Sequence, residues 1–290
     1  MPVISVTKCQ AAGNDFILYD ARRDQRLPYA QLAKLLCSRR FSVGADGLLV
    51  LSDPLATEAD VRMQVFNADG SEAEMCGNGV RCVARYMWEA DPAVTDAVVE
   101  TASGSVRTSV LAAGTDVRVR ATLGVPGFLD FPDGRRARPL KLDGCKAIAS
   151  LVSMGNRHLV CLVDRSPQLL SLSAALDLID SWKLNASSPN VELARVTDGR
   201  VEMRVHERGV GETWACGSGA CAAAACAMTL RRAPSPLRVE TRGGAVSVAW
   251  TGPGQPAELT GDAHLTFQAR VDLPLDLRDG VEAIGADAAR

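Results

Sequence analysis

Two cysteines occur in the same local sequence: Cys76 precedes Gly77-Asn78-Gly79, and Cys216 precedes Gly217-Ser218-Gly219. Each Gly-x-Gly is followed by small or apolar residues at helical spacing, which predicts that a helix begins there. The first backbone N–H groups of a helix have no partner within it, so they attract anions, and the helix dipole favours a thiolate. The sequence therefore predicts two thiols, each beside an anion-binding helix N-terminus.

The two cysteine segments are copies of each other, at an offset of 140 residues, the difference between positions 76 and 216. The repeat extends well beyond the cysteines, with Val, Met and Glu matching in strands and hairpins on both sides. The matched pairs include Glu72 and Glu212, Val61 and Val201, Met63 and Met203, Val65 and Val205, and Val99-Glu100-Thr101 and Val239-Glu240-Thr241. A period this long indicates a duplicated domain rather than a solenoid, whose repeats are shorter.

The order strand, cysteine loop, helix, hairpin in both copies predicts an α+β fold with two pseudo-symmetric domains. We expect the strands of each domain to wrap around a central helix. The first domain covers residues 1–125 and is completed by a C-terminal strand near 265–275. The second covers 126–264, with a linker within 124–144 because Gly and Pro are frequent there. A tail follows at 276–290.

Helices are predicted over 29–37, within 167–184 and after each cysteine, because apolar residues recur there at helical spacing. The helix expected over 219–230 is almost entirely Ala, Cys and Met, so it must be buried on every side. Strands are predicted over 3–8, 48–51 and 61–65 and near 265–270, where the pattern is apolar or alternates with period two. The other strands are expected at 98–101, 106–110, 116–123, within 146–163, and at 191–196, 201–206, 237–241 and 245–250.

Composition excludes several classes of function. The chain has 290 residues, 47% hydrophobic and 23% charged, with a formal net charge of −2. This balance favours a cytoplasmic protein without nucleic-acid or membrane partners. The nine cysteines form no C-x-x-C motif, and only three histidines accompany them, so no metal site is predicted. Dinucleotide and Walker fingerprints and an obvious pyridoxal-phosphate lysine are absent, so we expect no cofactor.

A pseudo-dyad that placed the two cysteine loops opposite each other would give a paired acid–base site. A carboxylate bound at the helix N-termini would hold its α-carbon between the sulfurs, where one thiolate removes a proton and the other thiol returns one to the opposite face. The alternatives are cysteines that merely fill tight turns, a disulfide switch between Cys76 and Cys216, and, third, a metal site. The duplication favours stereoinversion over cysteines that merely fill turns. The anion-binding loops favour stereoinversion over a disulfide switch, which does not need them.

The segments Phe66 to Cys82 and Glu207 to Cys221 closely resemble the two signatures of the diaminopimelate epimerase family. Shorter motifs at Gly13-Asn14-Asp15-Phe16, Ser153-Met154-Gly155-Asn156, Pro189-Asn190-Val191 and Thr251-Gly252-Pro253 follow the family's order over nearly the whole chain. The resemblance implies interconversion of LL- and meso-diaminopimelate, for lysine and peptidoglycan precursors, by a homodimer. Related racemases on this fold act on other amino acids and are the alternative.

The resemblance also implies a role for each matching residue. Cys76 and Cys216 are the acid–base pair, and the backbone amides around Gly77, Asn78, Gly217 and Ser218 hold the reacting carboxylate. The distal amino-acid end is assigned to Asn14, Asn67, Asn156, Asn190 and Arg208, of which Arg208 suits a carboxylate, and Glu207 is assigned an ammonium group.

Four positions depart from the family's pattern. Cys9 and Gln10 replace a usual Met and His, and Arg157 replaces a common Pro. Gly47 stands where some members have a substrate-contacting Gln, so no contact is assigned to it. His158 follows as in the family, but we interpret this single histidine as structural.

Overall fold

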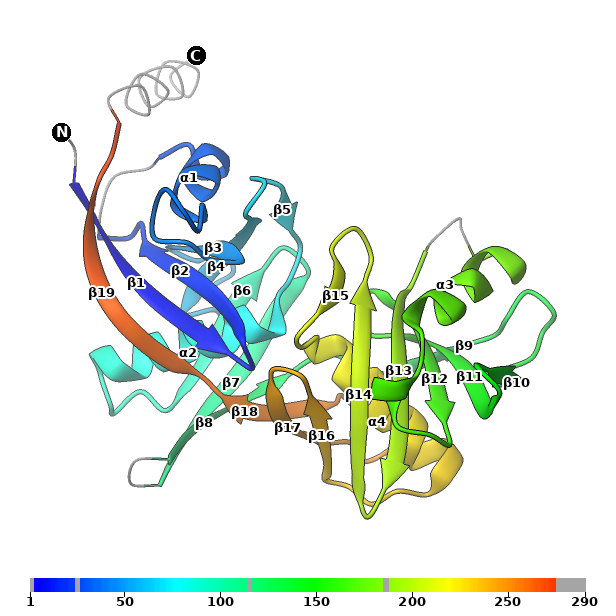
Figure 1. The fold of residues 1–290 in the computed structure, drawn as a ribbon. Helices are drawn as coiled ribbons and strands as arrows, with labels where there is room; N and C mark the ends of the chain where they lie inside the picture. Colours follow the sequence, from blue (N-terminus) through cyan, green and yellow to red (C-terminus); the bar gives the residue numbers. More distant parts are fainter. Residues whose placement is uncertain (1–2, 24–26, 114–115, 185–187, 275–290) are drawn as a thin grey trace. The chain divides into compact units, whose positions relative to one another are not determined.

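The computed structural model describes residues 3–23, 27–113, 116–184 and 188–274. The chain forms two compact units (Figure 1). Unit 1 comprises Met1–Val119 and Ala263–Arg290, and unit 2 comprises Arg120–Asp262. The predicted tail at 276–290 lies outside the described residues. Among the helices that are described, none is long and apolar enough to cross a membrane.

Unit 1 is one mixed sheet with two helices. Its elements are β1 (Val3–Ala11), β2 (Asn14–Asp20), α1 (Tyr29–Leu36), β3 (Gly47–Ser52), β4 (Val61–Asn67), β5 (Glu72–Ala73), α2 (Gly77–Ala90), β6 (Asp96–Thr101), β7 (Gly104–Ala113), β8 (Asp116–Thr122) and β19 (His264–Asp272). The pairings give the order β19-β1-β2-β3-β4-β6-β7, in which β2 with β3 and β4 with β6 run parallel. The chain passes into unit 2 within β8.

Unit 2 repeats this plan. Its elements are β9 (Gly127–Leu129), β10 (Arg138–Leu142), β11 (Cys145–Ser153), β12 (Arg157–Val163), the short 3-10 helix η1 (Pro167–Leu169), α3 (Leu172–Ser181), β13 (Asn190–Thr197), β14 (Arg200–Glu207), β15 (Gly211–Thr213), α4 (Gly217–Arg231), β16 (Leu237–Thr241), β17 (Gly244–Ala249) and β18 (Glu258–Asp262). The order β11-β12-β13-β14-β16-β17-β18 again contains two parallel pairs, β12 with β13 and β14 with β16.

The sequence repeat is also a repeat of strand register. Val61 pairs with Val99 across the parallel strands β4 and β6, and Val201 pairs with Val239 across β14 and β16. Both pairs of positions differ by the offset that separates the two cysteines. The predicted α+β fold, with two similar halves, is confirmed.

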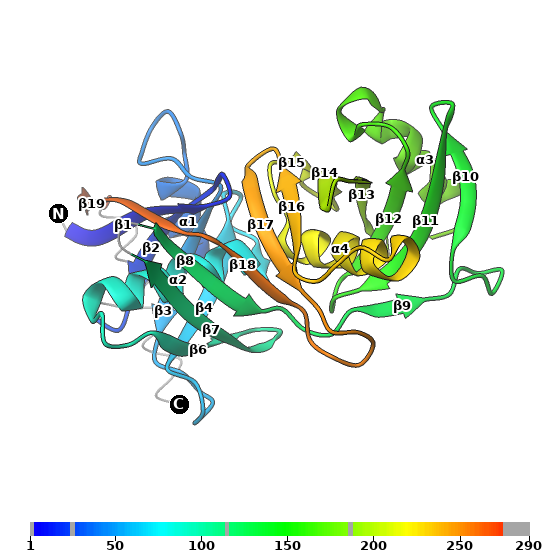
Figure 2. The same ribbon diagram turned by 90° about the horizontal axis from the view of Figure 1, so that it is seen from below.

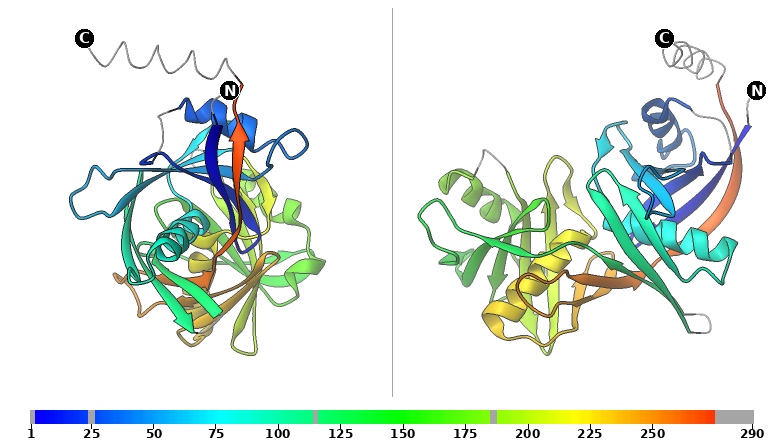
Figure 3. Two further views of the ribbon diagram at one scale, coloured as in Figure 1. Left: turned by 90° about the vertical axis from the view of Figure 1, so that its left-hand side faces the viewer. Right: turned by 180° about the vertical axis from the view of Figure 1, so that it is seen from behind.

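The helix after each cysteine lies against the sheet of its own unit. Helix α2 contacts β1, β2, β4, β6, β7 and β19, and the left-hand view of Figure 3 shows it, in cyan, with strands on several sides. Helix α4 contacts β11 to β14 and β16 to β18 and lies between strands in Figure 2. Every residue of α4 from Ser218 to Ala227 is buried. The predicted burial on all sides is therefore confirmed up to Ala227, whereas Met228 to Leu230 are partly or fully exposed. The alanines let strands approach the helix closely.

The opposite face of each sheet carries a second helix. In unit 1, Leu48 and Val50 of β3 belong to the core under α1, with Leu32 and Leu36. Leu49, between them, points instead toward α2, where its Cδ2 lies 2.9 Å from the position that a Cβ on Gly79 would take. Because β3 is buried on both faces, it is apolar without alternation. In unit 2, α3 packs on β11 to β13 in the same way.

The predicted linker is wrong. Residues 127–129 and 138–142 form β9 and β10, which both pair with β11 and belong to unit 2. Most glycines and prolines of this segment lie in turns between and beside the short strands, where such residues are common. Gly127 and Pro139 lie within β9 and β10 themselves. The high frequency of glycine and proline therefore indicated turns within unit 2 rather than a linker between the two domains.

Candidate active site

Each cysteine is the N-cap of the helix that follows it. The Sγ atom of Cys76 accepts a hydrogen bond from the N–H of Gly79 at 3.4 Å, and Sγ of Cys216 accepts one from Gly219 at the same distance. The sulfur thus satisfies one of the unpaired N–H groups of the first turn. Cys76 is half-buried, whereas Cys216 is 8% exposed.

Unit 1 gathers three of the predicted site residues around one amide oxygen. Oδ1 of Asn14 accepts from Nδ2 of Asn78 at 3.2 Å and lies 3.8 Å from the Cys76 sulfur. Nδ2 of Asn14 donates to Asp46 at 2.9 Å, while the buried Arg81 donates to Oδ1 of Asn78 at 2.9 Å. Asp46 thereby fixes the orientation of the Asn14 carboxamide, and Arg81 fixes that of Asn78.

Four charged side chains hold the strand ends of unit 1 together. Asp15 binds Lys8 at 2.5 Å and Arg39 at 2.6 Å, and Arg39 also binds Asp46 at 2.7 Å. Partial burial alone would raise the pKa of Asp15, but the hydrogen bonds from Arg39 and Lys8 outweigh it and lower this pKa well below its usual value. The ion pairs therefore stabilise the folded state above the ordinary carboxyl pKa, and this contribution is lost as the pH falls.

Unit 2 builds its half-site from a longer chain of contacts. The Ser218 Oγ lies 3.4 Å from the Cys216 sulfur and accepts from Asn156 Nδ2 at 3.4 Å. Oδ1 of Asn156 lies 3.0 Å from Nε2 of His158, whose Nδ1 lies 2.6 Å from Oε1 of Glu192. His158 and Glu192 are both 0% exposed. His158 is thus structural, as predicted, and it also contacts a predicted site residue.

Glu207 lies next to the Cys216 thiol. Burial raises the pKa of Glu207, and hydrogen bonds from Thr213, at 2.5 Å, and from Cys216 offset part of the rise. Burial raises the pKa of the Cys216 thiol well above its usual value, and the charge of Glu207 raises it further, whereas hydrogen bonds from Ser218 and Gly219 lower it. The expectation that each helix N-terminus favours a thiolate is wrong for Cys216, because burial and the nearby Glu207 outweigh the helix dipole.

The helix N-termini keep donors available for a ligand. The backbone N–H groups of Gly77, Gly217 and Ser218 donate to no other group in the described part of the chain. At a helix N-terminus such groups attract a carboxylate by about a kcal/mol each in partly buried geometry. Each half-site therefore combines a thiol with N–H donors for an anion.

Three other predicted site residues lie at or just beyond the ends of strands. Asn67, at the end of β4, donates to Ser71 Oγ at 2.9 Å. Asn190, at the start of β13, accepts from the backbone N–H of Arg208 at 2.9 Å. The Arg208 side chain is exposed and forms no ion pair with a described residue, so its guanidinium is available to a ligand. Asn67 makes no hydrogen bond to Cys76 or Asn14 in the described structure.

The repeated glutamate has a structural role. Glu212 binds Arg204 through two contacts, at 2.8 and 3.0 Å, and Glu72 accepts from Gln64 at 3.1 Å. Each contact joins the strand before the cysteine to the longer strand beside it. Glu72 and Glu212 thus help to position the two cysteine loops. Neither glutamate takes part in the chemistry that we propose.

Sequence reasoning missed Glu192, Asp46 and Arg81. Glu192 and Asn190 are two residues apart in β13, and a glutamate between the apolar residues Val191 and Leu193 was a usable signal. Arg81 was a weaker signal, because a single arginine in an amphipathic helix is usually exposed. Asp46 gave no signal, since Asp is common in turns.

Two of the departures have local explanations. Oε1 of Gln10 accepts from the Gly13 N–H at 3.1 Å and so supports the β1–β2 turn. A Cβ on Gly47 would lie 2.8 Å from the Phe66 carbonyl oxygen. The strand cannot accept a side chain there without moving.

Gly219 is required by close packing, which gives a testable prediction. A Cβ on Gly219 would lie 2.5 Å from Glu192 Oε1, an atom held by His158. We expect Gly219→Ala to destabilise the protein by about 1–3 kcal/mol, although Ala favours a helix over Gly by roughly 0.5–1 kcal/mol. Urea unfolding measures the effect. Gly79→Ala is the matched control, because its nearest atom is the end of the flexible Leu49 side chain, so its loss should be smaller. An equal or larger loss for Gly79→Ala would contradict this explanation.

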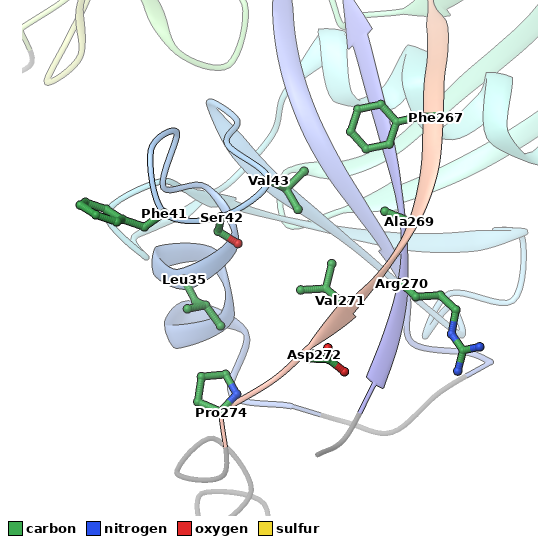
Figure 4. A pocket seen from close by; sticks show the side chains of 10 residues that line it. All are labelled: Leu35, Phe41, Ser42, Val43, Phe267, Ala269, Arg270, Val271, Asp272 and Pro274. Atoms are coloured by element: carbon green, nitrogen blue, oxygen red, sulfur yellow. The ribbon is translucent and has the colours of Figure 1, made fainter.

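A separate pocket of about 510 Å³ lies on unit 1 (Figure 4). Side chains of β19, α1 and the loop after α1 line it, and Phe41 and Phe267 are 90% and 47% exposed. None of the predicted site residues lines this pocket. It is therefore a surface feature distinct from the cysteine half-site of unit 1.

Known proteins resemble this chain over most of its length. The family model described as diaminopimelate epimerase matches residues 6–128 and 150–266. The diaminopimelate epimerase of Aromatoleum aromaticum is 37% identical over 279 residues, covering 92% of this chain and 98% of that protein. That of Teredinibacter turnerae is 38% identical over 276 residues, with the same coverage.

Solved structures share the fold at low sequence identity. A phenazine biosynthesis protein of the PhzF family from Bacillus anthracis has a TM-score of 0.69 and 17% identity and covers 94% of this chain and 100% of its own. A hydroxyproline epimerase from Agrobacterium vitis, bound to trans-4-hydroxy-L-proline, has a TM-score of 0.63 and 16% identity, over 93% and 91%. The family match and the close relatives decide the assignment: this chain belongs to the diaminopimelate epimerase family and is an isomerase.

Proposed function

We propose that this protein interconverts LL- and meso-diaminopimelate by two-thiol acid–base catalysis with Cys76 and Cys216. The observation that carries the proposal is the duplicated half-site: a thiol that caps a helix, beside N–H groups that can hold a carboxylate. Relatives at 37% and 38% identity that are named diaminopimelate epimerase support the substrate. The proposed role is in the synthesis of lysine and peptidoglycan precursors.

The substrate would be held at both ends. The N–H groups around Gly77, Asn78, Gly217 and Ser218 would bind the reacting carboxylate, which stabilises the negative charge that develops when the α-proton leaves. Polar side chains would bind the distal centre, with a bidentate contact from Arg208 to a carboxylate. The set proposed for this end is Asn14, Asn67, Asn156, Asn190 and Arg208. Glu207, beside Cys216, would bind an ammonium group of the substrate.

The proton transfers balance without a cofactor. One sulfur, as thiolate, takes the α-proton while the Cα–H bond breaks, and its electron pair passes toward the carboxylate. The other thiol then gives its proton to the opposite face of the α-carbon and becomes the thiolate. The mechanism requires both sulfurs to reach one α-carbon, from opposite faces. Reversal of the roles of the two thiols runs the reaction in the other direction.

Glu207 is proposed to set the protonation of Cys216. Because the Cys216 pKa is raised, this residue holds its proton before substrate binds and is ready to act as the acid. To act as the base it must first lose that proton, and the Glu207 carboxylate is the adjacent acceptor. The S–H bond breaks as a Glu207 O–H bond forms.

We further propose a cytoplasmic homodimer. The resemblance to the family supports both properties. The apolar pocket with the exposed Phe41 and Phe267 is the surface of unit 1 on which a second copy would bury the most exposed aromatic area. Light scattering of the purified protein tests the dimer: a monomer mass at micromolar concentration would contradict it.

Exchange of the α-proton tests the proposed reaction. The protein, without added cofactor, is incubated with LL-diaminopimelate in deuterated water, and the α-proton signal and the meso product are followed by NMR. We expect deuterium to enter at the inverted centre. Exchange with another amino acid but not with this substrate would assign the chain to a racemase of that amino acid. Reversible loss of both thiols on oxidation, with no exchange for any amino acid, would favour a disulfide switch.

A further inference from the structure

We infer that Glu192 is a positioning residue: with His158 it determines which end of the Asn156 carboxamide faces the ligand site of unit 2. Among the described residues Glu192 forms no hydrogen bond with the proposed substrate-binding set, but its Oε1 lies 2.6 Å from Nδ1 of His158. Both side chains are 0% exposed, so their geometry is set by packing rather than by solvent. The inference rests on the proposed function only for the role of Asn156 in binding.

The contacts fix the number of protons on this pair. Nε2 of His158 lies 3.0 Å from Oδ1 of Asn156, which can only accept, so Nε2 must carry a proton. Nδ1 faces a carboxyl oxygen, and one proton must also lie between Nδ1 and Glu192 for that contact to be attractive. The pair therefore holds two protons and has no net charge, which is the state that deep burial favours.

A second observation agrees with the neutral pair. Oε2 of Glu192 is buried and has no hydrogen-bond partner among the described residues. Burying one oxygen of an ionised carboxylate without a hydrogen-bond partner costs much hydration free energy. The carbonyl oxygen of a protonated carboxyl group loses much less hydration free energy when it is buried in this way. The geometry thus favours a Glu192 O–H that donates to Nδ1.

The proton on Nε2 orients the exposed amide beyond it. With Oδ1 of Asn156 held by His158, its Nδ2 points to Ser218 Oγ at 3.4 Å, and that oxygen lies 3.4 Å from the Cys216 sulfur. Loss of the Nε2 proton would place two acceptors against each other and turn the amide over. The NH₂ group would then no longer face Ser218 and the ligand.

Packing keeps Glu192 in place. Oε1 lies 2.5 Å from where a Cβ on Gly219 would stand, so the carboxyl group fills the space beside the first turn of α4. Besides His158, the titratable groups near Glu192 include Glu207 on β14 and the thiols of Cys161, Cys216 and Cys226. None of these four groups is a cation that would stabilise an ionised carboxylate.

Nitrogen-15 NMR of the imidazole ring tests the inference without substrate. The histidine signal is assigned in a His206→Gln, His264→Gln background, which leaves only His158. We expect a protonated Nε2 across the pH range in which the protein is folded and active. In Glu192→Gln the side-chain amide can donate to Nδ1, so Nε2 should stay protonated. In Glu192→Leu this donor is lost, and we expect the proton to move to Nδ1 in a large fraction of molecules.

Kinetics of the same variants give the second readout. Glu192→Leu should raise KM about tenfold, the effect of one misoriented hydrogen bond, with a smaller change in kcat. Glu192→Gln should restore KM, and Glu258→Gln, at a half-exposed position, is the control for the substitution itself. An unprotonated Nε2 in the wild-type protein would overturn the inference, and so would a Glu192→Leu variant that is folded and keeps both the Nε2 proton and KM. If the proposed substrate is wrong, the NMR result still stands.

Discussion

Replacing Cys76 or Cys216 with alanine is expected to abolish interconversion of LL- and meso-diaminopimelate, with kcat lowered by at least about 10²–10⁴-fold. Each face of the α-carbon needs its own group, so the remaining thiol cannot supply the missing proton transfer. Both cysteines also cap helices, through one hydrogen bond each to Gly79 and Gly219. Alanine should cost about 0.5–2 kcal/mol of stability there, which urea unfolding measures separately from turnover.

The pattern of isotope exchange makes this test specific. A variant that retains one thiolate can still remove the α-proton from one stereoisomer and return deuterium to the same face after the thiol exchanges with solvent. We expect each variant to exchange one stereoisomer without inverting it, and the two variants to differ in which one. Cys145→Ala removes a buried thiol outside the half-sites and is the control, with near-normal turnover. Full LL-to-meso activity in either site variant would contradict the two-thiol mechanism.

Replacing Glu207 with glutamine is expected to lower kcat/KM by about 10²-fold, the lower range for loss of a general base. The physical reason is the raised pKa of Cys216: without an adjacent carboxylate, the buried thiol has no acceptor for its proton. In the wild-type protein the carboxylate form of Glu207 is needed, so kcat/KM should fall as the pH drops through the raised pKa of Glu207. Glu207→Gln should remove this acid limb of the pH profile.

Thr213→Val separates this explanation from simple loss of packing. The Thr213 hydroxyl donates to Glu207 at 2.5 Å and lowers its pKa, so the variant should move the acid limb to higher pH while activity at high pH is kept. The measurement is kcat/KM against pH for the three proteins. An unchanged acid limb in Glu207→Gln would show that another group is responsible for it and would refute the proposed transfer.

The halves of the molecule differ where the sequence repeat is broken. In unit 1 the space beside the second glycine of Gly-x-Gly is filled by Leu49, and in unit 2 by Glu192. Conversely, α2 carries the buried Arg81 at the repeat position where α4 has Cys221. Unit 1 therefore orients its amides through a buried arginine, and unit 2 through the His158–Glu192 pair. Such an asymmetry suits a substrate with one inverting centre and one fixed centre.

The sequence by itself determined the duplication and the helix that follows each cysteine, and it also predicted the two thiols on which the proposed mechanism rests. These features depend on local spacing: a strand alternates with period two, a helix repeats near every fourth residue, and glycines expose N–H groups at a helix start. The burial of α4 was equally predictable, because a helix without a polar face can only lie inside the protein.

Only the tertiary structure decided which side chains contact the residues of each half-site and how these contacts shift the pKa of the Cys216 thiol. Asn14 meets Asn78 across 64 residues of chain, and His158 meets Glu192 across 34. No local pattern encodes such contacts, since they depend on which strands pair and which face of each strand meets the helix. The raised pKa of Cys216 has the same origin: the helix dipole is a local property, whereas burial and the proximity of Glu207 arise only when the unit is folded.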